Sequence, residues 1–210
     1  MANGKSYHHG DLRNALLTAA LMLVEENGLE GLSLRKVAAR VGVSHAAPEH
    51  HFPTLRHLMN AMATRGFELF ARSMAEERAS SPDIPVEQLR AAARGYLAYA
   101  RTHPGLFRLM FTSNLLDWND PVLLEQARCG HQQLVEICAP AAEFMGLRTD
   151  AERRALENLV WSQVHGQAHL TIDQKLPDTD NPDCPQPDKP LDIAELIFGG
   201  REGRRRVSGR

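Results

Sequence analysis

The hydrophobic residues of this chain recur at helical spacing along almost its whole length. Near the start, Leu12, Leu16, Ala19, Ala20 and Leu23 follow one another at offsets of 0, 4, 7, 8 and 11 residues. These offsets place all five side chains on one face of a helix. No stretch of any length alternates apolar and polar residues in the manner of a half-buried strand. The sequence therefore predicts an all-α fold.

Capping and helix-breaking residues divide this pattern into separate predicted helices. We expect Asp11 to cap the first helix, Gly28 to end it and Ser33 to cap the second. Gly42 permits a sharp turn, after which a short third helix is expected from His45 to His51. Further helices are expected from 54 to about 80, from the break at 80–85 to about 102, from 121 to about 144 and from 151 to about 174, with short pieces at 106–111 and 191–198.

The composition argues against several classes of protein. The formal net charge of −2 excludes a chain that is basic throughout, so any affinity for DNA has to come from a local surface. The three cysteines, Cys129, Cys138 and Cys184, lack metal-like spacing, and we expect buried, inert thiols at Cys129 and Cys138. The first residues are polar and no apolar run reaches membrane-spanning length. We therefore expect a cytoplasmic protein with no membrane partner.

The segment around Gly42 has the pattern of a helix-turn-helix. Ala38 lies four residues before Gly42, where a small side chain lets two helices approach closely. Val37, Val41 and Val43 supply apolar contacts between those helices. The last helix of such a unit enters the major groove of DNA. A tight helical hairpin with no role in DNA binding is the alternative interpretation.

Longer motifs around this segment resemble the DNA-binding head of the TetR (tetracycline-repressor-like) family. The resembling stretches are Tyr7–Leu17, Gly31–Ala38, Gly42–Pro48 and His50–Pro53. The resemblance implies a three-helix head, a homodimer, a palindromic double-stranded DNA operator and a helical body that responds to an unknown small-molecule effector. We therefore expect three parts, namely a head over 1–53, a ligand-binding and dimerisation body over 54–198, and a basic tail over 199–210 that its composition predicts to be disordered.

The resemblance assigns roles to individual residues of the head. Arg35 is expected to reach a base or a phosphate, His51 to contact a phosphate and Phe52 to anchor the core. Short side chains at Ala46 and Ala47 allow close approach, and their methyl groups can meet a thymine methyl. The residues expected to face DNA are Arg35, Lys36, Ser44, His45, Ala46, Ala47, Glu49, His50, His51 and Thr54.

Three positions depart from the family pattern. Glu49 stands where the family usually has Tyr, Leu55 where it has Lys, and His50 where Arg is common among close relatives. The first two replaced residues are usual phosphate contacts, so this head carries less positive charge than its relatives. The sequence therefore leaves a second function open: a TetR-shaped dimer that binds a ligand or a protein, with weak or lost specific DNA binding.

The body carries one further motif, in which Trp161, His165 and Gly166 resemble the Trp-His-Gly signature of one TetR C-terminal subtype. Glu157, Trp161, His165 and His169 recur every four residues and form one stripe on a helix. This stripe is either a pocket wall or ordinary core, and a metal site at His165 and His169 lacks an obvious third ligand.

Aromatic and apolar residues of the body are candidates for lining a cavity that holds a mainly apolar ligand. The residues expected to bind it are Tyr99, Phe107, Met110, Phe111, Trp118, Trp161, His165 and His169. We expect no cofactor and no metal. The sequence has no Gly-rich phosphate loop, nucleophile elbow, paired-carboxylate motif or zinc-hydrolase motif, and we expect no enzymatic activity.

Overall fold

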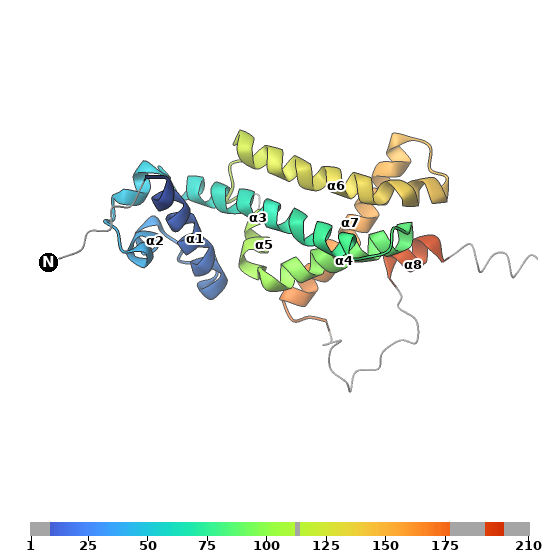
Figure 1. Cartoon of the computed structure of the whole chain (residues 1–210), viewed down its shortest axis with the longest axis horizontal. Coiled ribbons are helices and arrows are strands. Elements are labelled where there is room, and N and C mark those ends of the chain that lie inside the picture. The colour runs from blue at the N-terminus through green and yellow to red at the C-terminus, as the bar shows by residue number, and fades with distance from the viewer. Residues whose placement is uncertain (1–8, 112–113, 177–191, 200–210) are drawn as a thin grey trace, which may run out of the picture. The chain divides into compact units, whose positions relative to one another are not determined.

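The computed structural model describes residues 9–111, 114–176 and 192–199, and every regular element in these ranges is a helix (Figure 1). The elements are α1 (His9–Asn27), α2 (Leu34–Val41), the 3-10 helix η1 (Ala47–His50), α3 (Leu55–Ala79), α4 (Pro85–Thr102), α5 (Pro104–Met110), α6 (Pro121–Met145), α7 (Asp150–Ile172) and α8 (Ile193–Phe198). The all-α prediction is confirmed. Residues 177–191 and the expected basic tail after 199 lie outside the described residues.

Two compact units make up the chain, and each is described by itself. The first unit comprises residues 1–68 and 103–127, and it holds α1, α2, η1, α5 and the first part of α3. The second comprises residues 69–102 and 128–210, and it holds α4, α7, α8 and most of α6. The division of the chain into parts at 53 and 198 stays a prediction.

The two ends of α1 differ in how well the sequence predicts them. Gly28 ends the helix as expected, with a φ of 72° and an N–H that donates to the Val24 carbonyl at 2.8 Å. The expected start was wrong, because α1 begins at His9 and Asp11 therefore lies inside the first turn instead of capping it. An acidic residue suits the first helical turn as well as the cap position, since both lie at the positive end of the helix dipole. Residue type alone does not separate the two positions.

The sequence signals at both ends of α2 are confirmed. The Ser33 side chain accepts a hydrogen bond from the Lys36 N–H at 3.2 Å and so caps the first turn. At the other end, Gly42 adopts a φ of 78°, and the N–H groups of Gly42 and Val43 both donate to the Ala38 carbonyl, at 2.9 and 3.0 Å. A non-glycine residue is strained at this φ. Gly42 therefore lets the chain leave α2 sharply toward η1.

The expected third helix from His45 to His51 is shorter and tighter than predicted. The structure has only the 3-10 helix η1 there, preceded by a turn at His45 and Ala46. Proline has no N–H, so Pro48 cannot donate the α-helical hydrogen bond to the Ser44 carbonyl. The segment is held instead by tighter bonds, from Ala47 N to Ser44 O at 3.1 Å and from His51 N to Pro48 O at 2.9 Å.

Helix α5 is capped by a residue from a distant part of the sequence. His103 precedes the helix without capping it through its side chain. The Glu25 carboxylate of α1 accepts hydrogen bonds from the N–H groups of Gly105 and Leu106, at 3.1 and 3.3 Å. A Cβ atom at Gly105 would lie 2.8 Å from the Val24 carbonyl oxygen, so glycine is what allows α1 and α5 to approach this closely.

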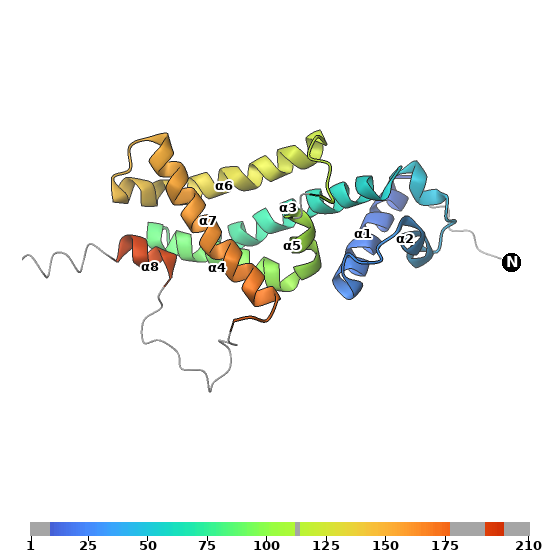
Figure 2. The ribbon, with the colours of Figure 1, turned by 180° about the vertical axis from the view of Figure 1, so that it is seen from behind.

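The second unit is built around α4, which packs against α7 and α8 (Figure 2). Its core consists of buried residues from α4, α6, α7 and α8: Leu89, Cys138, Ala141, Ala142, Leu156, Val160, Ile193, Ala194 and Ile197. Helix α7 begins with a capping box, in which Thr149 and Glu152 each bond the other's backbone N–H. This cap explains the start of α7 one residue before the expected 151.

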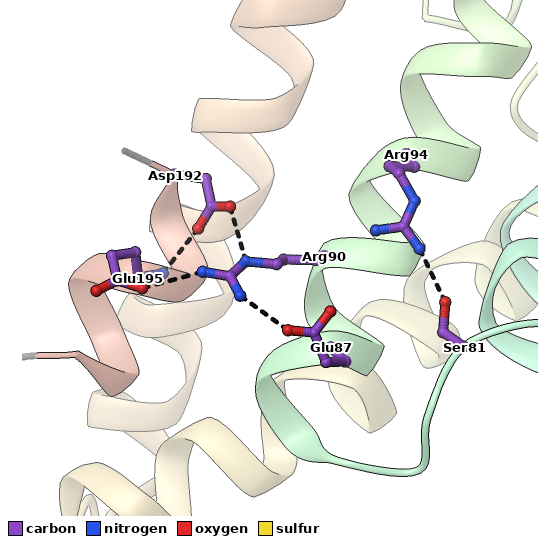
Figure 3. A network of polar contacts seen from close by, with 6 residues as sticks. All are labelled: Ser81, Glu87, Arg90, Arg94, Asp192 and Glu195. Atoms are coloured by element: carbon purple, nitrogen blue, oxygen red, sulfur yellow. Dashed lines mark hydrogen bonds and ion pairs between the residues drawn. The ribbon is translucent and has the colours of Figure 1, made fainter. Parts of the chain in front are cut away.

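Arg90 ties α8 to α4 (Figure 3). Its guanidinium group donates to Asp192 at 2.9 Å and to Glu195 at 3.0 Å, both on or beside α8, and to Glu87 of its own helix at 2.8 Å. The hydrogen bond with Asp192 is the largest of the effects that raise the pKa of Arg90. Asp192 also accepts from the Glu195 N–H at 2.7 Å, so the same carboxylate caps α8 and holds it against α4.

The expectation for the cysteines was right for Cys138 and wrong for Cys129. Burial, followed by the nearby Glu157 carboxylate, raises the pKa of the Cys138 thiol to about 12, so this group stays protonated near neutral pH. Cys129 lies exposed on α6, and Cys184 lies outside the described residues.

No described helix is both long enough and apolar enough to cross a membrane.

Candidate functional site

The residues expected to face DNA lie mostly on the surface of the first unit. Eight of the ten are exposed, and only Ala47 and His51 are half-buried. The turn at Gly42 brings the start of α2 and the η1 segment into one motif, while Phe52 directly after it is only 2% exposed. The expected core role of Phe52 therefore agrees with its burial. The DNA contacts of the ten residues stay predictions.

Positive charge on this motif is concentrated at the start of α2. Arg35 and Lys36 are exposed, and neither has a carboxylate partner among the described residues. Arg40, at the end of the same helix, is instead committed to Glu26, with two hydrogen bonds of 2.7 and 2.6 Å. Arg35 and Lys36 are therefore the uncommitted cations of α2.

The two residues that reduce the positive charge of the head, Glu49 and Leu55, lie in different environments. Glu49 is exposed in η1, whereas Leu55 is half-buried as the first residue of α3. Thr54, between them, uses its side chain locally: its Oγ1 lies 2.8 Å from His57 Nδ1 and accepts from the His57 N–H at 3.5 Å. Through this contact Thr54 caps α3, which begins at the next residue. The contact also makes Thr54 a less available phosphate ligand than Ser44.

The eight residues expected to bind a ligand are divided between the two units. Phe107, Met110, Phe111 and Trp118 belong to the first unit, and Tyr99, Trp161, His165 and His169 belong to the second. In the first unit Phe107 and Met110 are fully buried, and the ring centroids of Phe107 and Phe111 lie 4.9 Å apart. These residues contribute to the apolar core of that unit.

In the second unit a polar contact joins α4 to α7. Tyr96 is 5% exposed, and its hydroxyl lies 2.7 Å from Nδ1 of His165. Burial raises the pKa of Tyr96, and a hydrogen bond with the Trp161 side chain opposes this rise. Because the indole N–H can only donate, the Tyr96 oxygen accepts from Trp161. Which of Tyr96 and His165 donates in their own contact depends on the tautomer of His165.

His165 is held in its neutral form by the same surroundings. Desolvation by burial, followed by the neighbouring His169, lowers the pKa of His165 to about 4. The ring centroids of the two histidines lie 4.6 Å apart. In the parts of the chain that the structure describes, no group of three or more His, Cys, Asp or Glu side chains could hold a metal ion. At neutral pH His165 therefore offers a neutral imidazole.

The stability of the fold should fall on mild acidification because of His165. The unfolded chain takes up a proton near pH 6.5, whereas the folded chain resists protonation of His165 down to about 4. The free energy of unfolding should therefore decrease as the pH falls from about 6.5 toward about 4. Urea unfolding of the native chain and of His165→Gln at pH 7 and pH 5 measures this effect. We expect the native chain to lose more stability than the variant.

His131→Gln is the matched control, because His131 is exposed on α6. This variant should keep the full pH dependence of the native chain. If His165→Gln and the native chain lost stability equally between pH 7 and pH 5, the neutral state of His165 would not contribute to folding.

The predicted stripe on α7 runs from the interior to the surface. Glu157 is 8% exposed, His165 and His169 are half-buried, and Trp161 is 39% exposed. Trp161 therefore does not pack fully in the core, and a Cβ atom added at Gly166 would have no neighbour within 4 Å among the described residues. The polar role of Tyr96 depends on a partner 69 positions away, which no local pattern indicates.

Comparisons with known proteins match both parts of the chain. Residues 16–62 match the family described as bacterial regulatory proteins of the tetR family, and residues 89–185 match the family described as tetracyclin repressor-like, C-terminal domain. The HTH-type transcriptional regulator BetI of Stenotrophomonas maltophilia is 25% identical over 122 residues, which are 58% of this chain and 62% of BetI. The tetracycline repressor protein class A from transposon 1721 of Escherichia coli is 44% identical over 50 residues, 24% of this chain and 23% of the repressor.

Several solved structures match almost the full length of the chain. A protein of unknown function from Rhodococcus sp. RHA1 is 25% identical, with a TM-score of 0.70, and the match covers 97% of this chain and 98% of that protein. The matches to BetI and the repressor span less than two thirds of either relative. The two family matches cover the helix-turn-helix and most of the body, and the chain belongs to the TetR family of bacterial regulatory proteins.

Proposed function

We propose that the chain is a DNA-binding transcriptional regulator of the repressor type, whose affinity for its operator is modulated by a small, mainly apolar ligand. The observation that carries the proposal is the exposed surface of α2, η1 and the turns beside them, where eight of the ten residues expected to face DNA are exposed. The match of residues 16–62 to a family of regulatory proteins supports it.

Different residues of this surface have different tasks in the proposed complex. Arg35 and Lys36 are exposed and uncommitted, and their charges suit phosphate oxygens. Ser44 adds a neutral hydroxyl donor. Ala46 is exposed at the turn before η1, and its methyl group suits a thymine methyl. Phosphate contacts set the position of the protein on the duplex, and the base contacts select the sequence.

The proposal is tested with DNA from upstream of the gene that encodes this chain. Fluorescence anisotropy should show binding that the unlabelled fragment displaces and that bulk DNA displaces only at much higher concentration. Ala46→Asp places a carboxylate at the proposed base contact, where an acidic residue also suits the helix start, and it should abolish binding. Ala79→Asp, exposed at the end of α3, is the matched control and should bind normally. Equal displacement by both DNAs would contradict the proposal.

We place the effector site in the second unit, at Trp161, His165 and His169 on α7. The half-exposed Trp161 ring provides apolar surface, and the neutral His165 provides a polar group. These residues also support assignment of the C-terminal part to the Trp-His-Gly subtype. Tyr99, Phe107, Met110, Phe111 and Trp118 belong to the proposed ligand set through their apolar character alone.

The chain is proposed to act as a homodimer through α6 and α7. On α7, Leu159 is 55% exposed and Leu170 is 45% exposed, and their offset of 11 residues places them on one face together with Gly166. Static light scattering at micromolar concentration should give twice the mass of one chain. The double variant Leu159→Glu with Leu170→Glu should give a monomer, because it sets like charges in an apolar contact.

Leu196→Glu is the matched control for this experiment. Leu196 is 63% exposed, but it lies on α8. The control should remain a dimer. A native monomer would contradict the proposed assembly, and a dimer that survives both changes on α7 would exclude this face of α7 as the interface.

A further inference from the structure

A groove of about 620 Å³ lies between α1 and α3 within the first unit. One face of α1 contributes Arg13, Leu17 and Leu21, and one face of α3 contributes Ala61 and Arg65. Cavities that bind small molecules commonly measure about 300–1,000 Å³, so the groove is large enough for such a ligand. None of the residues that were expected to bind a ligand lines it.

The two carboxylates that line the groove are already committed. Glu68 accepts from Arg65 at 2.8 Å in the same helix. Asp120 accepts from the N–H groups of Val122 and Leu123, at 2.9 and 3.0 Å, and from Asn60 at 3.3 Å. The Leu123 hydrogen bond is the largest of the effects that lower the pKa of Asp120. Both carboxylates keep their negative charge at neutral pH, and the positive charges of Arg13 and Arg65, which also line the groove, balance them.

Arg13 is the charged group of the groove that remains available. Its guanidinium carbon lies 5.1 Å from the centroid of the Phe52 ring, which is only 2% exposed and therefore held firmly. No described residue gives Arg13 an ion pair or a hydrogen bond. The contact with Phe52 orients the guanidinium without occupying its N–H groups. Those donors fit a carboxylate, which arginine binds with two parallel hydrogen bonds.

Apolar side chains continue the groove beyond Arg13. Leu17 and Leu21 follow Arg13 at offsets of four and eight residues on the same face of α1. Ala61 of α3 and Val122 of α6, the latter 61% exposed, add apolar surface. The groove therefore places an arginine beside apolar surface, which suits an anionic head group with a hydrocarbon tail.

We propose that this groove binds a small carboxylate with an apolar tail, with the carboxylate on Arg13 and the tail against Leu17, Leu21 and Val122. The site is separate from the effector site proposed at Trp161, His165 and His169. It does not depend on DNA binding. An occupant contacts α1 and α3 together, so it links the first helix of the chain to the helix that follows η1.

Isothermal titration with sodium octanoate tests the proposal directly on the full chain. We expect saturable binding at one site per chain, and binding at least tenfold weaker for octanol and for octylammonium, because neither pairs with Arg13. Arg13→Gln should weaken octanoate binding roughly tenfold or more. Arg72→Gln removes an exposed arginine of α3 that pairs with Glu76 outside the groove, and it should leave binding unchanged.

Ala61→Phe provides a second, independent variant because it fills the groove without touching Arg13. Circular dichroism first establishes that each variant is folded, and octanoate binding should then be lost in Ala61→Phe. Octanol binding as tight as octanoate binding would overturn the role of Arg13. Absence of saturable octanoate binding, or binding that both Arg13→Gln and Ala61→Phe leave intact, would overturn the site.

Discussion

Gly95→Ala should destabilise the protein, although alanine normally stabilises a helix more than glycine does. Gly95 lies within α4, and a Cβ atom there would lie 2.6 Å from both the Met74 Cα and the Ser73 carbonyl oxygen of α3. Both atoms belong to the backbone, so α3 and α4 have to separate. The Ser73 hydroxyl also donates to the Gly95 carbonyl at 2.9 Å, and separation would stretch this bond. Overpacking of this kind costs about 1–3 kcal/mol, which exceeds the gain of about 1 kcal/mol from helix propensity.

Gly66→Ala is the matched control, since Gly66 is also a buried glycine inside a helix. A Cβ atom at Gly66 would lie 2.6 Å from the Met110 sulfur, which is part of a flexible side chain that can move. We expect the free energy of unfolding to change by less than about 1 kcal/mol, because the gain in helix propensity offsets the cost of repacking the Met110 side chain. Urea unfolding of the two variants measures both effects. A Gly95→Ala variant as stable as Gly66→Ala would mean that α3 and α4 do not pack this tightly.

Sequence patterns predicted the helices of this chain well, because most helix ends here are decided by local chemistry. Gly28 and Gly42 end their helices through positive φ angles, and Ser33 and Thr54 begin theirs through side-chain caps. These interactions join residues at most four positions apart. Such signals are complete within the sequence segment that carries them.

Most of the features that sequence reasoning missed depend on distant partners or on competition between neighbouring signals. Glu25 caps α5 across about 80 positions, and Arg90 binds Asp192 across 102 positions. Pro48 is a local signal, but its effect was underestimated: it converts the expected third helix into a short 3-10 turn. Tyr96 and His165 belong to separate helices, and only the packing of α4 on α7 brings their polar atoms together.

The helix-turn-helix surface is exposed, so the strength of its binding to DNA depends mainly on its charge. Glu49 is exposed and negative in η1, where the family usually places a neutral phenol. Leu55 begins α3 in a half-buried position, where the family usually places a cation. Both residues therefore reduce the attraction between this head and phosphate. The alternative function, a family member with weak or lost specific DNA binding, follows from these two positions alone.

The double variant Glu49→Tyr with Leu55→Lys should bind DNA more tightly than the native chain. The change at 49 removes a carboxylate and adds a hydroxyl donor. A lysine at 55 can keep its apolar stem half-buried while its charged end reaches solvent. Each added phosphate contact steepens the logarithmic salt dependence of binding by roughly 0.9, so two contacts raise affinity on the order of tenfold to a hundredfold at about 0.1 M salt. Sequence preference should change little, because phosphate contacts carry no base information.

Anisotropy titrations at several salt concentrations, with the upstream fragment and with bulk DNA, measure affinity and salt slope together. Glu143→Tyr with Leu196→Lys makes the same change in net charge at exposed positions of α6 and α8, and it should leave both quantities nearly unchanged. Tight native binding that the double variant does not alter would mean that this head docks differently from its relatives. Specific binding by the variant alone would identify the native chain as a DNA-silent member of its family. If neither protein bound the upstream fragment more tightly than bulk DNA, the helix-turn-helix would be present in the fold without the proposed function at that fragment.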